Sequence, residues 1–110
     1  MGSLPEISMS SLGISTQHLA HMEQNPQWAA SPQYALGFIV TVSNGAALTY
    51  SVQITADQAP SPNGNWNDHQ DFSGLSNSQN GNVGYPITGY RLNVTAYTNG
   101  TVHLGVARWP

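Results

Sequence analysis

The sequence predicts an all-β fold, a small antiparallel β-sandwich or flattened barrel of about six to seven strands with an extended N-terminal arm. Three observations predict it. Apolar and polar residues alternate in four stretches, Asn-Gly pairs follow the first and third of them, and the chain has no cysteine that could staple a small irregular fold. Alternation gives a strand one apolar face. The 110 residues are enough for one domain with one core.

The first third of the chain differs from the rest. Residues 1–33 show neither sustained helical spacing nor alternation, and three prolines interrupt them. We expect these residues to form the arm and residues 34–110 to form the sandwich. Residues 18–24 can form one or two helical turns, which the following Asn-Pro pair ends because proline disfavours helix in the residue before it. Scattered apolar residues predict that the arm lies against its own sandwich or a neighbouring subunit.

Two hairpins are predicted after the arm. Residues 36–42 and 48–54 form the first, and residues 90–96 and 102–106 form the second. A three-residue loop in each, with its glycine in the left-handed region, pairs apolar positions with apolar positions, so that Val94 lies opposite Leu104. Between the hairpins, a stretch rich in Pro, Asn, Ser and Gly predicts short strands.

The charge balance excludes several partners. Only 6% of the residues are charged, lysine is absent, and the formal net charge is -3. Binding to nucleic acid or to an anionic membrane requires a cluster of cations, so we expect neither partner. A surface of uncharged polar residues is typical of proteins that pack against other protein. The N-terminus has no basic, apolar leader, so we expect synthesis in the cytoplasm.

No pattern indicates catalysis, a metal or a cofactor. The chain lacks a nucleophile-elbow sequence and a phosphate-binding glycine motif. His18 and His21 are three residues apart, as two metal ligands on a helix would be, but no third ligand follows at a suitable spacing. His103 is expected on the exposed face of its hairpin, opposite Thr95. We therefore expect a protein that is not an enzyme.

A polar cluster follows Trp66 in the middle of the chain. Asp68, His69 and Asp71 lie close enough in sequence to hold a cation or a sugar. The alternative is turn chemistry, in which Asp68 accepts backbone hydrogen bonds, His69 caps the turn, and Trp66 plugs the end of the sandwich. A calcium loop needs more acidic ligands than this segment contains.

Three further residues are candidate contacts. Arg91 and Tyr97 lie on the polar side of their strand and are expected at an interface. Arg108 falls opposite Tyr90 at the end of the sheet. It either stacks on that ring at the rim or meets a carboxylate, Asp57 or Glu6.

The C-terminal half resembles a known class of protein. The residues that carry the resemblance are Trp66-Asn67-Asp68-His69, Gly81-Asn82, Tyr85-Pro86-Ile87-Thr88 and the run from Arg91 to Val102. This stretch resembles small virion-associated structural proteins of tailed bacteriophages. The resemblance implies a capsid decoration or virion-stabilising protein, homo-oligomeric and often trimeric, bound to a capsid or other virion protein. It implies no catalytic residues, and nothing in it covers residues 1–33.

Two other functions compete with this one. A carbohydrate-binding module would use the aromatic rings of Trp66, Tyr85, Tyr97 and Trp109 as platforms for sugars. A hydrolase would require a cleft, which the sequence does not indicate.

Overall fold

The computed structural model describes residues 2–3, 6–15, 18–19, 36–57, 61, 63–84 and 87–108, with the backbone alone at residues 2, 3, 18, 19 and 108. These residues form strands and turns and include no helix. The strands in chain order are β1 (Gly2–Ser3), β2 (Ile7–Met9), β3 (Gly13–Ile14), β4 (His18–Leu19), β5 (Leu36–Val42), β6 (Ala47–Thr55), β7 (Asn67–Asp68), β8 (Gln79–Val83), β9 (Gly89–Asn99) and β10 (Val102–Arg108).

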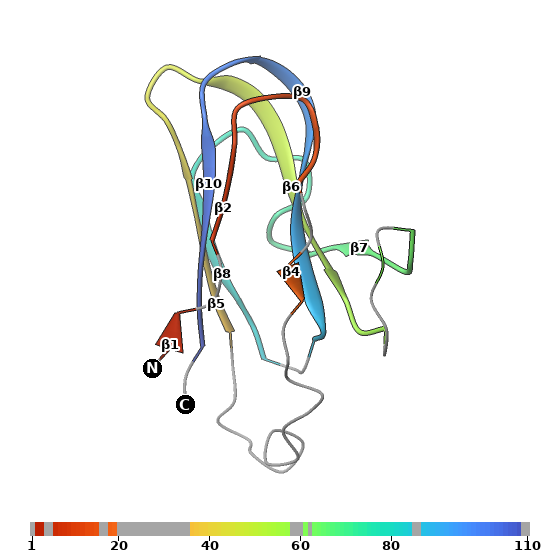
Figure 1. Cartoon of the computed structure of the whole chain (residues 1–110). Coiled ribbons are helices and arrows are strands. Elements are labelled where there is room, and N and C mark those ends of the chain that lie inside the picture. Colours follow the sequence, from red (N-terminus) through yellow and green to blue (C-terminus); the bar gives the residue numbers. More distant parts are fainter. Residues whose placement is uncertain are drawn as a thin grey trace.

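The strands form two antiparallel sheets that pack face to face (Figure 1). In sheet A the order is β1-β10-β5-β8, with β2 also paired to β10. In sheet B the order is β3-β9-β6-β7, with β4 also paired to β9. When β2 is counted as the first strand and β3 and β4 together as the second, sheet A has the order first, eighth, third, sixth and sheet B the order second, seventh, fourth, fifth. This is the strand order of a jelly roll. The predicted β-sandwich is confirmed.

The two predicted hairpins are wrong. β5 does not pair with β6 but with β10, where Val40 lies opposite Leu104. β6 likewise pairs with β9, where Tyr50 lies opposite Val94. The turns at residues 43–46 and 100–101 are therefore arches that carry the chain from one sheet to the other. An arch and a hairpin both turn the apolar faces inward, so alternation alone does not distinguish them.

A β-bulge changes the pattern near the end of β9. The register with β6 shifts between the pair Thr49–Ala96 and the pair Tyr50–Val94, so Thr95 is the additional residue. Beyond the bulge Ala96 is exposed and Tyr97 is half-buried against the core. The alternation predicted along residues 90–96 places Ala96 on the apolar face, and this is wrong because strict alternation takes no account of the extra residue.

The core lies between the sheets and contains nearly all of the apolar positions that the alternation assigns to it. Val94 and Leu104 are both buried there, but they belong to opposite sheets. Residues from outside the four long strands also fill the core: Ile7, Phe72, Val83 and Ile87. Burying each side chain of this size contributes about 1.5–3 kcal/mol.

The N-terminal arm closes one side of the sandwich. β1 and β2 lie on β10 in sheet A, and β3 and β4 lie on β9 in sheet B, so the chain crosses between the sheets at residues 10–12. Of the predicted helical turn, His18 and Leu19 lie in β4, and residues 20–24 lie outside the described residues. On the opposite side, the chain crosses from β7 in sheet B to β8 in sheet A.

Candidate functional site

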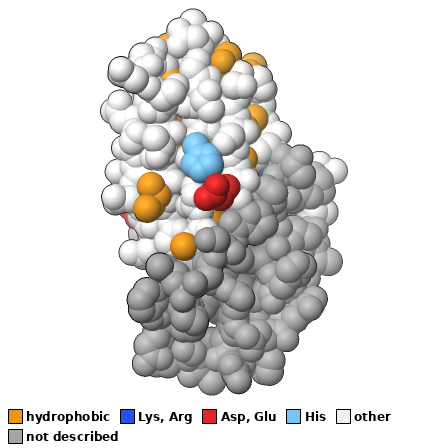
Figure 2. Space-filling model, turned by 60° about the vertical axis from the view of Figure 1, so that its left-hand side comes forward, with side chains coloured by type: hydrophobic (Ala, Val, Ile, Leu, Met, Phe, Trp, Pro, Cys, Tyr) orange, Lys and Arg blue, Asp and Glu red, His pale blue; other side chains and the backbone are white. Residues whose placement is uncertain are grey.

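The outer face of sheet A, called here the sheet A face, carries small and neutral side chains. Its outward residues alternate with buried ones along β5 and β10, β8 adds two exposed asparagines, and Glu6 and Ser8 continue the face toward the edge. Figure 2 shows one histidine and one acidic side chain side by side on a face whose described part is otherwise mostly uncharged. The outward residues of β5, β8 and β10 are Gly37, Ile39, Thr41, Asn80, Asn82, His103, Gly105 and Ala107.

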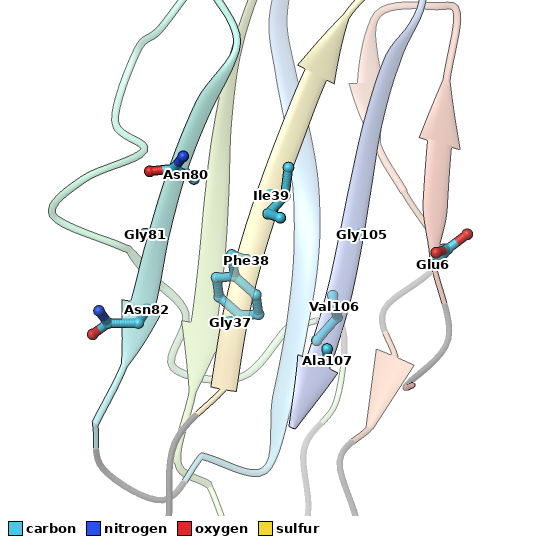
Figure 3. Close-up of a pocket in the computed structure, with 10 residues that line it drawn as sticks. All are labelled: Glu6, Gly37, Phe38, Ile39, Asn80, Gly81, Asn82, Gly105, Val106 and Ala107. Carbon is cyan, nitrogen blue, oxygen red and sulfur yellow. The ribbon is translucent and has the colours of Figure 1, made fainter. Parts of the chain in front are cut away.

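A shallow depression of about 610 Å³ lies on this face (Figure 3). Gly37 and Gly105 line it without side chains, and Glu6 borders it on the side of β2. Ile39 stands beside it with 60% of its surface exposed. The arrangement combines an apolar projection with a floor that another backbone can approach closely.

Three polar side chains form a row at the edge of the sheet A face. Ser8 Oγ lies 2.7 Å from His103 Nδ1, and His103 Nε2 lies 3.5 Å from Glu6 Oε2. The trio contains a hydroxyl, an imidazole and a carboxylate, the groups of a nucleophilic site. The side chains of His103 and Glu6 are 41% and 58% exposed, so water competes for both. The row ties β2 to β10.

His103 does not have its predicted neighbour. It lies opposite Thr41 of β5 on one side and Ser8 of β2 on the other, whereas a hairpin would have placed Thr95 there. The predicted outward direction is nevertheless right, because His103 alternates with the buried Val102 and Leu104. The observed neighbours differ from the predicted one because β9 and β10 belong to different sheets.

A second cluster lies on the outer face of sheet B and includes three of the residues singled out in the sequence. Arg91 Cζ lies 4.3 Å from the centre of the Trp66 ring, and Arg91 Nε donates to Gln53 Oε1 at 2.7 Å. Gln53 Nε2 donates to Asp68 Oδ1 at 3.0 Å. The Trp66 Nε1–H donates to the carbonyl of Ser61 at 2.7 Å. Together these contacts hold the segment around Trp66 over β6 and β9.

This cluster corrects two predictions. Trp66 does not plug the end of the sandwich, because it lies on the outer face of sheet B over Arg91. Arg91 is only 7% exposed, so it is not an open interface contact. Burial lowers the pKa of Arg91 from its ordinary value. Gln53, which joins Arg91 to Asp68, had no signal in the sequence beyond its outward position on a strand.

His69 points the opposite way from Asp68, into the core. Its Nδ1 accepts the N–H of Asp71 at 3.1 Å, and its Nε2–H donates to the carbonyl of Asn82 at 2.7 Å. The ring is 3% exposed and packs edge-on against Phe72 at 5.2 Å. His69 thus caps its turn, as the turn interpretation predicts, and also joins the two sheets.

The remaining candidates lie apart from both clusters. Tyr97 is near the arch end of β9, where its hydroxyl donates to the carbonyl of Gly100 at 3.0 Å. Arg108 pairs with Leu36 and Gly2 at the far end of β10, so its predicted position opposite Tyr90 is wrong. The Arg108 side chain lies outside the described part of the chain, as do Tyr85, Trp109 and His21.

The described residues bring no three potential metal-ligating side chains together. None of the described segments forms a helix long and apolar enough to cross a membrane. Comparison of the chain with family models, with curated proteins and with solved structures finds no match.

Proposed function

We propose that this protein is a structural component of a bacteriophage virion, a capsid decoration or stabilising protein. In this proposal it is made in the host cytoplasm, assembles as a homo-oligomer, with a trimer as the favoured state, and packs on a capsid or another virion protein. The observation that carries the proposal is the sheet A face, with its small neutral side chains and exposed Ile39.

The physical reason is the low cost of covering this face. Its described residues include one carboxylate, Glu6, which already lies beside His103, so burial desolvates few charges. Gly37 and Gly105 let a partner backbone come close, and burying Ile39 contributes about 1.5–3 kcal/mol. These properties favour protein as the partner over a small charged ligand.

The fold agrees with this function without deciding it. Jelly rolls occur in viral capsid proteins and in lectin-type domains, and a fold of this kind supports several functions. The resemblance of residues 50–108 to virion-associated proteins favours the first of these groups.

Light scattering after size-exclusion chromatography tests the assembly. We expect an oligomer whose mass falls to that of the monomer in the variant Ile39→Lys. The matched control is Thr95→Lys, which places the same charge at an exposed β-branched residue of sheet B. A wild-type monomer at high concentration, or equal behaviour of the two variants, would count against the proposal. Mass spectrometry of purified particles tests the location.

Carbohydrate binding is the second candidate, and Trp66 is the observation that favours it. The indole is half-buried, and its contacts with Arg91 and Ser61 hold it in place beside the exposed Asp68. Tyr97 lies near the arch end of β9, away from Trp66, so these two rings do not form one platform. A glycan array with wild type and Trp66→Ala tests this function, and binding that both proteins share would exclude Trp66 as its site.

A further inference from the structure

One short segment completes both sheets on the same side of the sandwich. Residues 6–15, called here the edge segment, include β2, which pairs with β10, and β3, which pairs with β9. Ser8 lies opposite His103, and Gly13 lies opposite Val94. Figure 1 shows the segment running along β10 and then crossing to β9 at the end of the molecule where the arches lie. The segment therefore covers two strand edges at once.

Few side chains hold the edge segment in place. Ile7 is the one fully buried side chain in it, at 5% exposure, and Met9 packs partly against the core. The polar contacts of the segment include the Ser8–His103 pair. At its other end the N–H of Ser15 donates to the carbonyl of Leu92, and the N–H of Leu92 donates to Ser15 Oγ, both at 2.9 Å. One buried aliphatic side chain and four short ladders, those of β2 and β3 and of the two-residue strands β1 and β4 that flank the segment, form an anchor that can detach without opening the rest of the core.

Detachment of the edge segment leaves two open strand edges that are the same in every copy. Without the edge segment, β9 and β10 present unpaired N–H and C=O groups, which recruit another strand. The strand that fits best is the edge segment itself, because only it places an apolar residue at the position of Ile7 and a serine opposite both His103 and Leu92. A second copy supplies this segment with the same contacts.

The length of the chain allows the segment to reach a neighbour. Residues 20–35 connect β4 to β5. A stretch of this length spans at most roughly 53–58 Å when extended. The longest dimension of the molecule is 43 Å. The connection is therefore long enough for the edge segment of one copy to lie on the body of another.

Two apolar side chains of the segment are not covered by their own chain. Leu12, where the segment crosses between the sheets, is 63% exposed, and Ile14, in β3, is 54% exposed. The segment carries one charged residue, Glu6, so exchange transfers only one charged side chain from one copy to another.

We propose that copies of this chain exchange residues 2–19, which are the edge segment with β1 and β4 on either side of it, so that β1 to β4 of one copy complete the two sheets of another. This inference rests on the proposed homo-oligomeric assembly and states how the copies are joined. Exchange of an identical element is a low-cost route to oligomers, because the exchanged contacts already exist within one copy.

Cysteine crosslinking between two differently tagged chains tests the exchange, since the natural sequence has no cysteine. One chain carries Ser8→Cys and the other His103→Cys, and the two are refolded together and oxidised. We expect a disulfide-linked pair of unlike chains. Residue 8 of one chain lies directly opposite residue 103 of the other only when the segment has been exchanged. Pairing Ser8→Cys with Thr98→Cys on β9 is the control for random collision.

A single chain that carries both cysteines resolves the other outcomes. It must form a disulfide in any case. If that disulfide is wholly intramolecular while light scattering still shows an oligomer, exchange is wrong and the assembly proposal stands. If the protein is monomeric, both proposals fail.

The variant Ile7→Asp gives a second measurement. We expect it to lower the oligomer mass while circular dichroism still shows a folded sandwich, and Ser10→Asp, at an exposed position in the same segment, to leave the mass unchanged. A folded Ile7→Asp variant with the mass of the wild-type oligomer would overturn the exchange.

Discussion

Ser43 and Thr101 exchange two hydrogen bonds and thereby join the two arches. The N–H of Ser43 donates to the carbonyl of Thr101 at 2.9 Å, and the N–H of Thr101 donates to Ser43 Oγ at 2.9 Å. The arches belong to strand pairs far apart in the sequence, so this contact fixes β5 beside β10 and β6 beside β9.

The variant Ser43→Ala removes the side-chain half of this contact. We expect the free energy of unfolding to fall by about 1 kcal/mol, because the Thr101 N–H loses its acceptor. Urea unfolding measures the change. Thr98→Ala, at an exposed side chain near the same end of the molecule, is the control and should change stability by less than about 0.5 kcal/mol. Equal effects would show that the hydrogen bond contributes nothing.

Gly100 should tolerate no side chain. Its φ is +100°, and an added Cβ would clash with Ala46 of the neighbouring arch. We expect Gly100→Ala to destabilise the fold by about 1–3 kcal/mol. Gly84→Ala is the matched control, because no atom lies within 4 Å of an added Cβ there and its φ is not positive. Thermal unfolding of the two variants measures the difference, and a fully stable Gly100→Ala would contradict the arch geometry.

The sequence predicts the inward faces better than the strand neighbours. Alternation assigns Phe38, Tyr50 and Leu92 to the core, and all three are fully buried. The same alternation is satisfied by a hairpin and by an arch, so it could not show that Val94 and Leu104 lie in opposite sheets. The choice depends on contacts between distant segments, such as Ser43 with Thr101, which no local pattern records.

The candidate contacts were predicted less well, for a similar reason. Trp66, Asp68 and Arg91 lie in one network, but Gln53 joins two of them from a strand that is distant in sequence. The row that contains Ser8 and His103 depends on the arm pairing with β10. The apolar residues of the arm predict that it lies on a surface but not which strand it pairs with, so the position of Ser8 on the sheet A face had no signal in the sequence.

Alkaline pH should weaken the fold through two buried tyrosines. Burial raises the pKa of Tyr50 from its ordinary value of 10.0 to about 12, and burial also raises the pKa of Tyr90. Below about pH 10 both phenols are neutral in the folded and unfolded chain, and stability does not depend on them. Above about pH 10 the tyrosines of the unfolded chain lose their protons, whereas the buried tyrosines of the folded chain keep theirs to a higher pH. We therefore expect the free energy of unfolding to fall by up to about 1.4 kcal/mol per pH unit for each tyrosine.

Urea unfolding at about pH 9 and about pH 11 measures this effect, and phenolate absorbance reports ionisation. Tyr50→Phe removes one of the two groups, so its stability should fall less steeply over the same range. It also removes the hydroxyl that donates to the carbonyl of Asn77 at 2.7 Å, which lowers its stability at neutral pH by about 1 kcal/mol. Identical slopes for wild type and variant would exclude Tyr50 as a cause.

Ser8 should not act as a nucleophile, although it contacts an imidazole and, through it, a carboxylate. Activation of a serine depends on a base held in a water-excluded site, and the side chains of His103 and Glu6 are 41% and 58% exposed. We expect a fluorophosphonate probe to leave Ser8 unmodified in mass spectrometry of the intact protein. Stoichiometric labelling that His103→Gln abolishes would contradict this expectation and would revive the hydrolase interpretation. Without labelling, the Ser8–His103 contact stabilises the pairing of β2 with β10, and Ser8→Ala should loosen that strand in hydrogen exchange.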